Sequence, residues 1–315
     1  MSSSPPTDSS VSVAAAASSS VVRTPPLWSG LALALLGSIA FSGKAIIVKL
    51  AYRHGVDAVT LITYRMLFAL PMFLALAWWS GRGRAALTRH DWKVVLSLGF
   101  LGYYLASFLD FAGLQYVSAS LERLILYLNP TLVLAINVFV FKRGIKPMQL
   151  LALAVSYGGV ALVFGQEIHL QGADAVLGAV LVFGSAVSYA LYLSYSGEQV
   201  KRLGALRLTG MATTVACFLC IAQFLILRPL SALVVAPEVI WLSVLNATLC
   251  TFAPVLMVML AIERVGATVT AQVGMVGPMS TLIMGVLILG EPFTLWLVAG
   301  TLLVLTGVWL LARWR

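Results

Sequence analysis

Charge is scarce in this sequence. Only 10% of the 315 residues are Asp, Glu, Lys or Arg, whereas soluble domains carry about 25%. Hydrophobic residues make up 61% of the chain, and a soluble fold of this length could not bury that much apolar surface. The scarcity of charge therefore excludes the soluble enzymes and soluble binding domains as classes.

Histidine and cysteine are also rare. The three histidines, His54, His90 and His169, all fall between the apolar stretches, so no histidine-based catalytic or metal cluster is expected. Cys217 and Cys220 form a C-x-x-C spacing inside an apolar run, which favours buried small hydrophobic residues over a redox or metal site. We expect no cofactor, no metal and no enzymatic activity.

The chain contains ten apolar stretches, each near 20 residues long. A helix of that length crosses a bilayer core of ~30 Å, and a helix satisfies its own backbone in lipid. The pattern predicts an all-α integral membrane protein with ten transmembrane helices. The predicted spans are 28–50, 59–79, 94–113, 119–141, 148–164, 176–195, 208–227, 239–262, 267–289 and 293–312.

Basic residues set the expected orientation. With the N-terminus inside, fourteen of the 20 Lys and Arg fall in cytoplasmic segments and two in external ones, which predicts that both termini are cytoplasmic. This distribution explains the net charge of +9 without nucleic-acid binding. Residues 1–26 are rich in Ser, Ala and Pro and are expected to form a disordered cytoplasmic tail rather than a signal peptide.

A weak internal repeat appears when the chain is shifted by 148 residues. Gly30 then matches Gly178, and Pro130 matches Pro278. The two halves, 27–166 and 175–315, hold five spans each, and an odd number of spans inverts the second half relative to the first. We therefore predict two inverted-topology five-helix repeats, a plan found in many secondary transporters.

Short motifs mark particular spans. Pro130 lies in the fourth span, Pro278 in the ninth, the run 290–292 (Gly-Glu-Pro) follows the ninth, and Arg65 lies in the second. With the ten spans and the duplication, these residues resemble the drug/metabolite transporter superfamily, specifically its EamA-type ten-helix branch. The resemblance covers about residues 28–312 and is strongest to bacterial inner-membrane exporters of amino acids, including aromatic ones.

The first half departs from the pattern of this family. Lys142 and Arg143 stand where the second half has Gly290 and Glu291. The first repeat thus lacks the family turn and carries additional positive charge.

Six charged residues lie inside predicted spans of the first repeat, all toward the external side. A charge at the bilayer centre costs at least ~2.5–3.5 kcal/mol, so each needs a partner or a role. Lys49 and Arg123 are expected to snorkel to the outer interface. Two alternatives stay open for the others: fixed ion pairs of Asp110 or Glu122 with Lys44 or Arg65, or an external gate in which Lys44 and Arg65 meet a substrate carboxylate. Glu122, and after it Asp110, are the candidates for proton coupling or gating.

Uncharged polar residues form stripes on several predicted helices. The tyrosines favour a cavity wall because each phenol needs a partner away from lipid, whereas small hydroxyls can equally join helices. A glutamine beside methionines suits a pocket for varied apolar substrates. The candidate substrate-binding residues are Lys44, Arg65, Tyr103, Ser107, Asn129, Ser185, Ser188, Tyr189, Tyr192, Asn246, Gln272 and Met275.

These features predict a secondary transporter that exports small metabolites, amino acids above all, across the inner membrane by alternating access. The alternative is a flippase of lipid or lipid-linked substrates with the same architecture. The expected partners are a small-molecule substrate and membrane lipid, with no nucleic acid, and a monomer is slightly favoured.

Overall fold

The computed structural model describes residues 27–140, 142, 144–265, 267–274 and 276–313. Within these ranges, nine helices are long and apolar enough to cross a membrane, and the shorter apolar segment Val276–Leu289 belongs to the remaining crossing. All ten predicted spans are thus found. The largest shifts in boundary are at the ends of the fifth and sixth spans, which continue to Gln171 and Leu203, because hydropathy marks the lipid-embedded part of a helix rather than its end.

The first repeat contains five crossings. Its helices are α1 (Leu27–Tyr52), α2 (Ala58–Gly81), the continuous run of α3 (Arg89–Leu98), η1 (Gly99–Leu105) and α4 (Ala106–Leu114), the broken pair α5 (Ala119–Leu126) and α6 (Asn129–Phe139), and α7 (Pro147–Gln171).

The second repeat has the same order of elements. It comprises α8 (Asp174–Leu203), α9 (Ala205–Leu227), the run of α10 (Pro237–Ala247), η3 (Thr248–Phe252) and α11 (Ala253–Val265), then α12 (Ala267–Gly274), α13 (Val276–Met284) and η4 (Gly285–Leu289), and α14 (Leu295–Arg313). A short 3-10 turn, η2 (Leu230–Leu233), lies in the connection between α9 and α10.

Two of the helix irregularities coincide with prolines. The fourth crossing breaks between α5 and α6, directly before Asn129 and Pro130, where proline removes a hydrogen bond and opposes the preceding turn. The π-helical turn η3 precedes Pro254, and its wider winding suits a residue that cannot donate to the usual acceptor. By contrast, α2 continues through Pro71.

Equivalent contacts recur at the predicted offset of 148 residues. A β-carbon at Gly30 would collide with Arg264 and Val265, and one at Gly178 would collide with Tyr116 and Val117. Gly178 lies 148 residues after Gly30, and Arg264 and Val265 lie 148 residues after Tyr116 and Val117. The contact of α1 with the end of α11 is therefore equivalent to the contact of α8 with the residues that follow α4. The two π-helical turns η1 and η3 also correspond at this offset. The prediction of two inverted five-helix repeats is confirmed.

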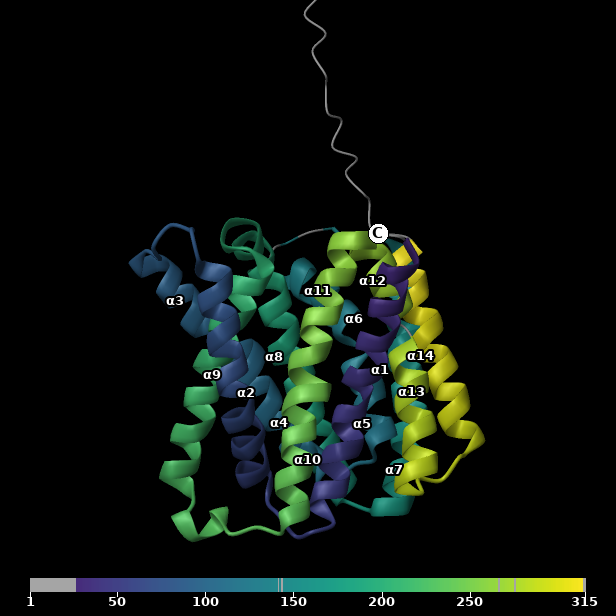
Figure 1. Ribbon diagram of the computed structural model, residues 1–315. Coiled ribbons are helices and arrows are strands. Elements are labelled where there is room, and N and C mark those ends of the chain that lie inside the picture. The colour runs from purple at the N-terminus through teal and green to yellow at the C-terminus, as the bar shows by residue number, and fades with distance from the viewer. Residues whose placement is uncertain (1–26, 141, 143, 266, 275, 314–315) are drawn as a thin grey trace, which may run out of the picture.

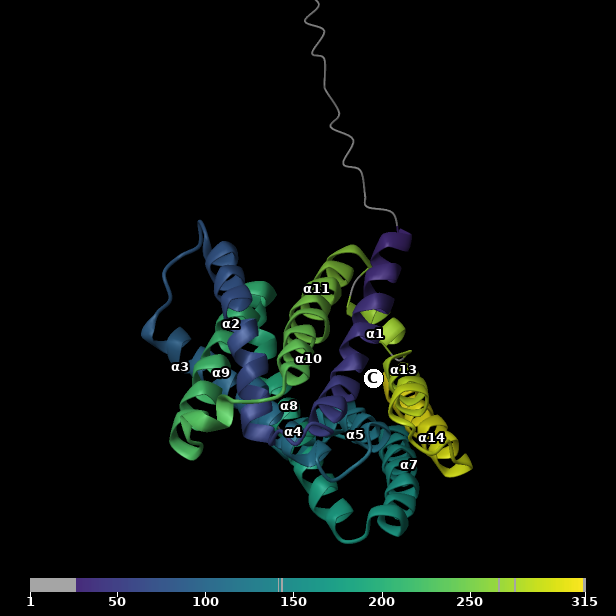
Figure 2. The same ribbon diagram turned by 60° about the horizontal axis from the view of Figure 1, so that its bottom comes forward.

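The helices form one bundle, in which α1 begins and α14 ends on the same side. In Figure 1, α2 and α9 lie at one flank and α13 and α14 at the other, with α1, α10 and α11 between them. In Figure 2, α4, α5 and α8 appear below this central group, on the side that faces away from the viewer in Figure 1. The end of the bundle at which α1 begins is called the N-terminal end below, and the opposite end is called the far end.

Glycines allow the last helix of each repeat to pack closely. The backbone of Gly159 in α7 faces that of Gly300 in α14, and a β-carbon at Gly159 would come within 2.7 Å of the Gly300 carbonyl oxygen. Gly165, two turns further along α7, has open space around it. This contact between the repeats therefore depends on the absence of a side chain at Gly159.

Replacing Gly159 by Leu is expected to destabilise the protein by about 1–3 kcal/mol, since the new side chain forces α7 and α14 apart. Gly165→Leu adds the same side chain to the same helix and is expected to leave stability unchanged. Thermal unfolding in lipid nanodiscs measures both. Equal melting temperatures for the two variants would contradict the role given to this contact.

Candidate functional site

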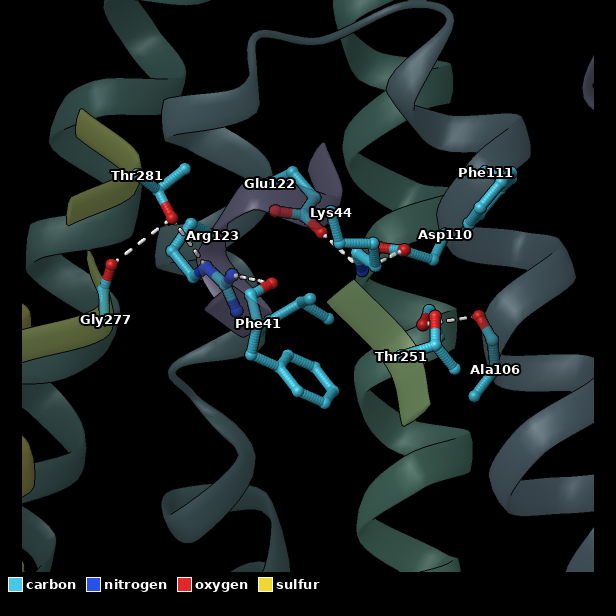
Figure 3. Close-up of polar contacts among 12 residues, drawn as sticks. Phe41, Lys44, Ala106, Asp110, Phe111, Glu122, Arg123, Thr251, Gly277 and Thr281 are labelled. Carbon is cyan, nitrogen blue, oxygen red and sulfur yellow. Dashed lines mark hydrogen bonds and ion pairs between the residues drawn. The ribbon is translucent and has the colours of Figure 1, made fainter. Parts of the chain in front are cut away.

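Three charged side chains meet inside the bundle, between α1, α4 and α5. Lys44 Nζ lies 2.5 Å from Asp110 Oδ2 and 3.0 Å from Glu122 Oε1, and all three side chains are buried. Figure 3 shows Lys44 reaching both carboxylates. The sequence left two alternatives open for Lys44, an ion pair or a gate that meets the substrate. In the structure, Lys44 forms ion pairs with both carboxylates.

Arg65 lies near these groups but forms no ion pair with any described carboxylate. Its Nε donates to Thr251 Oγ1 at 3.0 Å, and its guanidinium carbon lies 5.1 Å from the centre of the Phe111 ring. The side chain is buried. A cation over an aromatic face gains electrostatic stabilisation, which helps to keep Arg65 in this position.

The prediction that Arg123 snorkels to the outer interface is wrong. The residue is only 7% exposed; its Nε donates to Thr281 Oγ1 and its Nη2 to the Phe41 carbonyl, both at 2.9 Å. Every residue from Ala119 to Ile125 of α5 is buried. This helix has no lipid-facing side along which a long side chain could reach the interface.

Lys49 is half-buried near the far end of α1, and its position at the outer interface stays a prediction. Its Nζ donates to the carbonyls of Leu114 and Val117 at 3.1 and 2.9 Å. It therefore binds the last carbonyl of α4 and one in the connection to α5, as a cation at a helix C-terminus commonly does.

A cavity of about 320 Å³ lies on the N-terminal side of the charged residues. Its depth can be followed along α1, where the lining begins at Ala34 and ends at Ser42, two residues before Lys44. A second cavity of about 400 Å³, which shares Ile262 with the first, lies nearer the N-terminal end. The first is lined by Ala34, Gly37, Ser38, Phe41, Ser42, Arg123, Tyr127, Val258, Ile262, Thr270, Gly274 and Gly277.

Most hydroxyls of the first cavity are bound to the backbone of the ninth crossing. Ser38 and Tyr127 donate to the Gly274 carbonyl, at 2.9 and 2.5 Å, and Ser42 donates to the Gly277 carbonyl at 2.8 Å. These carbonyls lie where α12 ends and α13 begins, so the hydroxyls satisfy a helix terminus within the bundle.

At the far end, two carboxylates bind the start of α5. Glu291 Oε1 accepts from the Ala119 amide at 2.6 Å, and its Oε2 accepts from the Ser120 amide at 3.2 Å and the Ser120 hydroxyl at 2.6 Å. Glu167 accepts from the Ser118 amide at 2.6 Å. Because Glu291 belongs to the second repeat and α5 to the first, the hydrogen bonds of Glu291 join the two repeats. Glu167, Glu291 and residues 118–120 are together called the far-end latch below.

The turn after η4 explains how Glu291 reaches α5. Gly290 adopts φ of +73°, a left-handed conformation that suits glycine and ends the helix. A β-carbon at Gly285 would lie 2.7 Å from Glu291 Oε2, so a glycine there leaves room for the carboxylate. Sequence reasoning noted the Gly-Glu-Pro run only as a family marker and assigned Glu291 no contact.

The hydroxyl stripe of α8 joins helices. Ser185 donates to the Ala106 carbonyl at 2.7 Å and Ser188 to the Leu101 carbonyl at 2.8 Å. Neither serine lines the first cavity. For Ser185 and Ser188, the structure therefore shows hydroxyls that join helices, because both donate to backbone carbonyls of η1 and α4.

The tyrosines of the same stripe form a separate cluster. The hydroxyls of Tyr103 and Tyr192 lie 3.0 Å apart, and the ring of Tyr189 stacks on Tyr192 at 5.5 Å. They pack against α3 and α9 in the N-terminal half, and none of the three lines the first cavity. Their proposed contact with substrate stays a prediction.

The remaining candidates are dispersed. Asn129 donates to the Leu126 carbonyl of its own crossing at 2.6 Å, Asn246 is buried, and Ser107 is partly buried on α4. The side chain of Gln272, and the whole of Met275, lie outside the described residues. Of the twelve candidate binding residues and two coupling residues, the structure brings together Lys44, Asp110 and Glu122, with Arg65 nearby.

Two inverted repeats, with buried charges near the middle and the two larger cavities on one side of them, form an architecture that is typical of transporters. Comparison with known proteins gives the family. The EamA-like transporter family matches residues 28–165 and again residues 176–313, and the chain belongs to this family, within the drug/metabolite transporter superfamily.

The similar proteins cover between about half and nine tenths of the chain. "Uncharacterized transporter YcbK" of Bacillus subtilis (strain 168) is 29% identical over 89% of this chain and 92% of its own length. "WAT1-related protein At1g68170" of Arabidopsis thaliana is 27% identical over 53% of this chain and 55% of its own. One crystal structure shares the fold with a TM-score of 0.60 at 17% identity, covering 92% of this chain and all of the other.

Proposed function

We propose that the protein exports small metabolites by alternating access, with amino acids, including aromatic ones, as the expected substrates. One observation carries the proposal: the two larger cavities lie in the N-terminal half, while the far end holds the ion pairs of Lys44, the far-end latch and only a smaller cavity of about 140 Å³ among the described residues. With the N-terminus in the cytoplasm of a bacterial cell, as the basic residues predict, this is the state that loads substrate from inside the inner membrane.

The first cavity suits a small molecule with an apolar part. Its volume of about 320 Å³ is at the lower end of the ~300–1,000 Å³ that ligand pockets occupy. Phe41, Val258 and Ile262 supply apolar surface, and Arg123 supplies a charge. An amino acid with an apolar side chain combines both features.

Glu122 is the proposed coupling group. Its Oε1 faces Lys44, and its Oε2 has no hydrogen-bond partner in the described ranges, which leaves one carboxylate oxygen able to take up a proton. A proton on Glu122 would weaken its attraction to Lys44 and so loosen the closure between α1 and α5. Asp110 is the second candidate because it shares the same lysine.

Efflux from reconstituted vesicles tests the function. Vesicles loaded with labelled phenylalanine, tryptophan, leucine or glutamate should release at least one of them faster than protein-free vesicles, and unlabelled substrate outside should give counterflow. An imposed pH gradient should change the rate if Glu122 couples protons. Absence of flux for every amino acid, together with movement of labelled phospholipid between leaflets, would replace the proposal by a flippase.

A further inference from the structure

Arg123 has hydrogen-bonding capacity that the protein does not use. A guanidinium carries five N–H donors. The single N–H of Nε donates to Thr281, and one N–H of Nη2 donates to the Phe41 carbonyl. Arg123 forms no other hydrogen bond with the described part of the chain. The residue is nonetheless buried, and it lines the first cavity.

The charges around Arg123 do not balance. Lys44, Arg65 and Arg123 are buried cations, whereas Asp110 and Glu122 are the buried carboxylates among them. Both carboxylates lie against Lys44, at 2.5 and 3.0 Å. With all five ionised, the group carries one net positive charge, and a cation without a counter-charge inside a membrane is costly.

Two arginines could receive an added anion, and their surroundings differ. Arg65 lies between Thr251 and the Phe111 ring and does not line the first cavity. Arg123 lines it, beside apolar surface from Phe41 and Val258. A ligand that enters the cavity can therefore reach Arg123.

We propose that Arg123 is the anion-binding residue of the transport site and that the substrate carries one carboxylate on an apolar body. The carboxylate accepts hydrogen bonds from the free N–H groups of Arg123 in the charge-assisted geometry that guanidinium favours. The apolar body lies along Phe41 and Val258, and the carboxylate is the local counter-charge that Arg123 lacks among the described residues. This inference rests on the proposed function and names the substrate class and its contact.

Matched acid and amide probes test the proposal on the full-length protein in nanodiscs of zwitterionic lipid. L-Phenylalanine and benzoate are compared with L-phenylalaninamide and benzamide by calorimetry. We expect the acids to bind at least ~10-fold more tightly than the amides, and Arg123→Gln to weaken acid binding by a similar factor. Arg123→Lys keeps the charge but loses the planar fork and should fall between the two.

Arg228→Gln is the control variant. Arg228 is an exposed arginine at the far end that binds Asp57, and its removal should leave the affinity for both acids unchanged. If Arg123→Gln does not fold, the comparison of acids with amides on the unmodified protein and on Arg123→Lys still tests the role of Arg123. Equal affinities for acid and amide, unchanged binding by the Arg123 variants, or no binding of either acid would each overturn the proposal.

Efflux separates this inference from the proposed function. If acids bind through Arg123 but no amino acid leaves the vesicles, the anion site stands and the export function fails. If amino acids leave the vesicles equally fast with Arg123→Gln, the export function stands and the anion site fails.

Discussion

Replacing Lys44 by Met is expected to destabilise the protein by about 3–5 kcal/mol and to abolish efflux. Asp110 and Glu122 both face Lys44, at 2.5 and 3.0 Å. Without the ammonium, two carboxylates remain buried beside each other, and neither forms another ion pair within the described residues. Breaking a buried ion pair by removing one partner costs about this much. Thermal unfolding in nanodiscs and vesicle efflux measure the two effects.

Two further variants show whether charge is the cause. Lys93→Met makes the same change at an exposed position of α3 and should alter neither stability nor efflux. The triple variant Lys44→Met, Asp110→Asn, Glu122→Gln removes all three charges and should regain most of the stability while efflux stays lost. A Lys44→Met protein as stable as the unmodified one would show that these ion pairs do not hold α1 against α4 and α5.

The fold could be predicted because lipid imposes a strict rule on length. Each crossing needs about 20 apolar residues, so hydropathy located all ten spans. The shift of 148 residues, found from pairs such as Gly30 and Gly178, also relates the packing contacts of those glycines. The π-helical turn η1 was not foreseen, since the sequence Gly99–Leu105 contains no proline or other signal for it.

The site was less predictable because depth along a helix does not reveal which neighbour a side chain meets. The sequence located Lys44, Asp110 and Glu122 at similar depth but left their pairing open. Arg123 was expected at the interface since long cations usually escape there, and only the burial of α5 on every side excludes this. Serines such as Ser185 are ambiguous for another reason, because both a cavity wall and a helix contact call for small hydroxyls.

The two repeats differ in the chemistry that holds their ends. At the offset of 148 residues, Lys44 corresponds to Tyr192, and Arg65 to Thr213. The ion pairs of Lys44 thus have no counterpart at the equivalent positions of the N-terminal half, where Tyr103 and Tyr192 form a hydrogen-bonded pair. The ion pair of Arg202 with Asp91 lies nearer the N-terminal end. In an inverted-repeat transporter, the closed arrangement of one end is exchanged for that of the other during the cycle, and unequal closures give the two states unequal stability.

Replacing Glu291 by Ala is expected to open the far end. Three hydrogen bonds from Ala119 and Ser120 are lost, and a hydrogen bond to a charged group contributes about 1.5–3 kcal/mol. Even one such bond shifts a two-state equilibrium by ~10-fold or more. The position 148 residues earlier is Arg143, whose positive charge would be unfavourable at a helix N-terminus, so no equivalent carboxylate is available to hold the opposite end.

Thiol labelling from the far side measures this opening. A cysteine at Gln166, which lines a small cavity beside the latch, is introduced after the buried Cys217, Cys220 and Cys250 are replaced. Glu291→Ala should raise its reaction rate with a membrane-impermeant maleimide by at least ~10-fold, whereas Glu238→Ala, at an exposed position on the same side, should not. Because only the far end has a carboxylate at this position of the repeat, the effect is expected for Glu291→Ala alone. A rate raised equally by both variants, or by neither, would mean that Glu291 caps α5 without determining which end of the transporter is open.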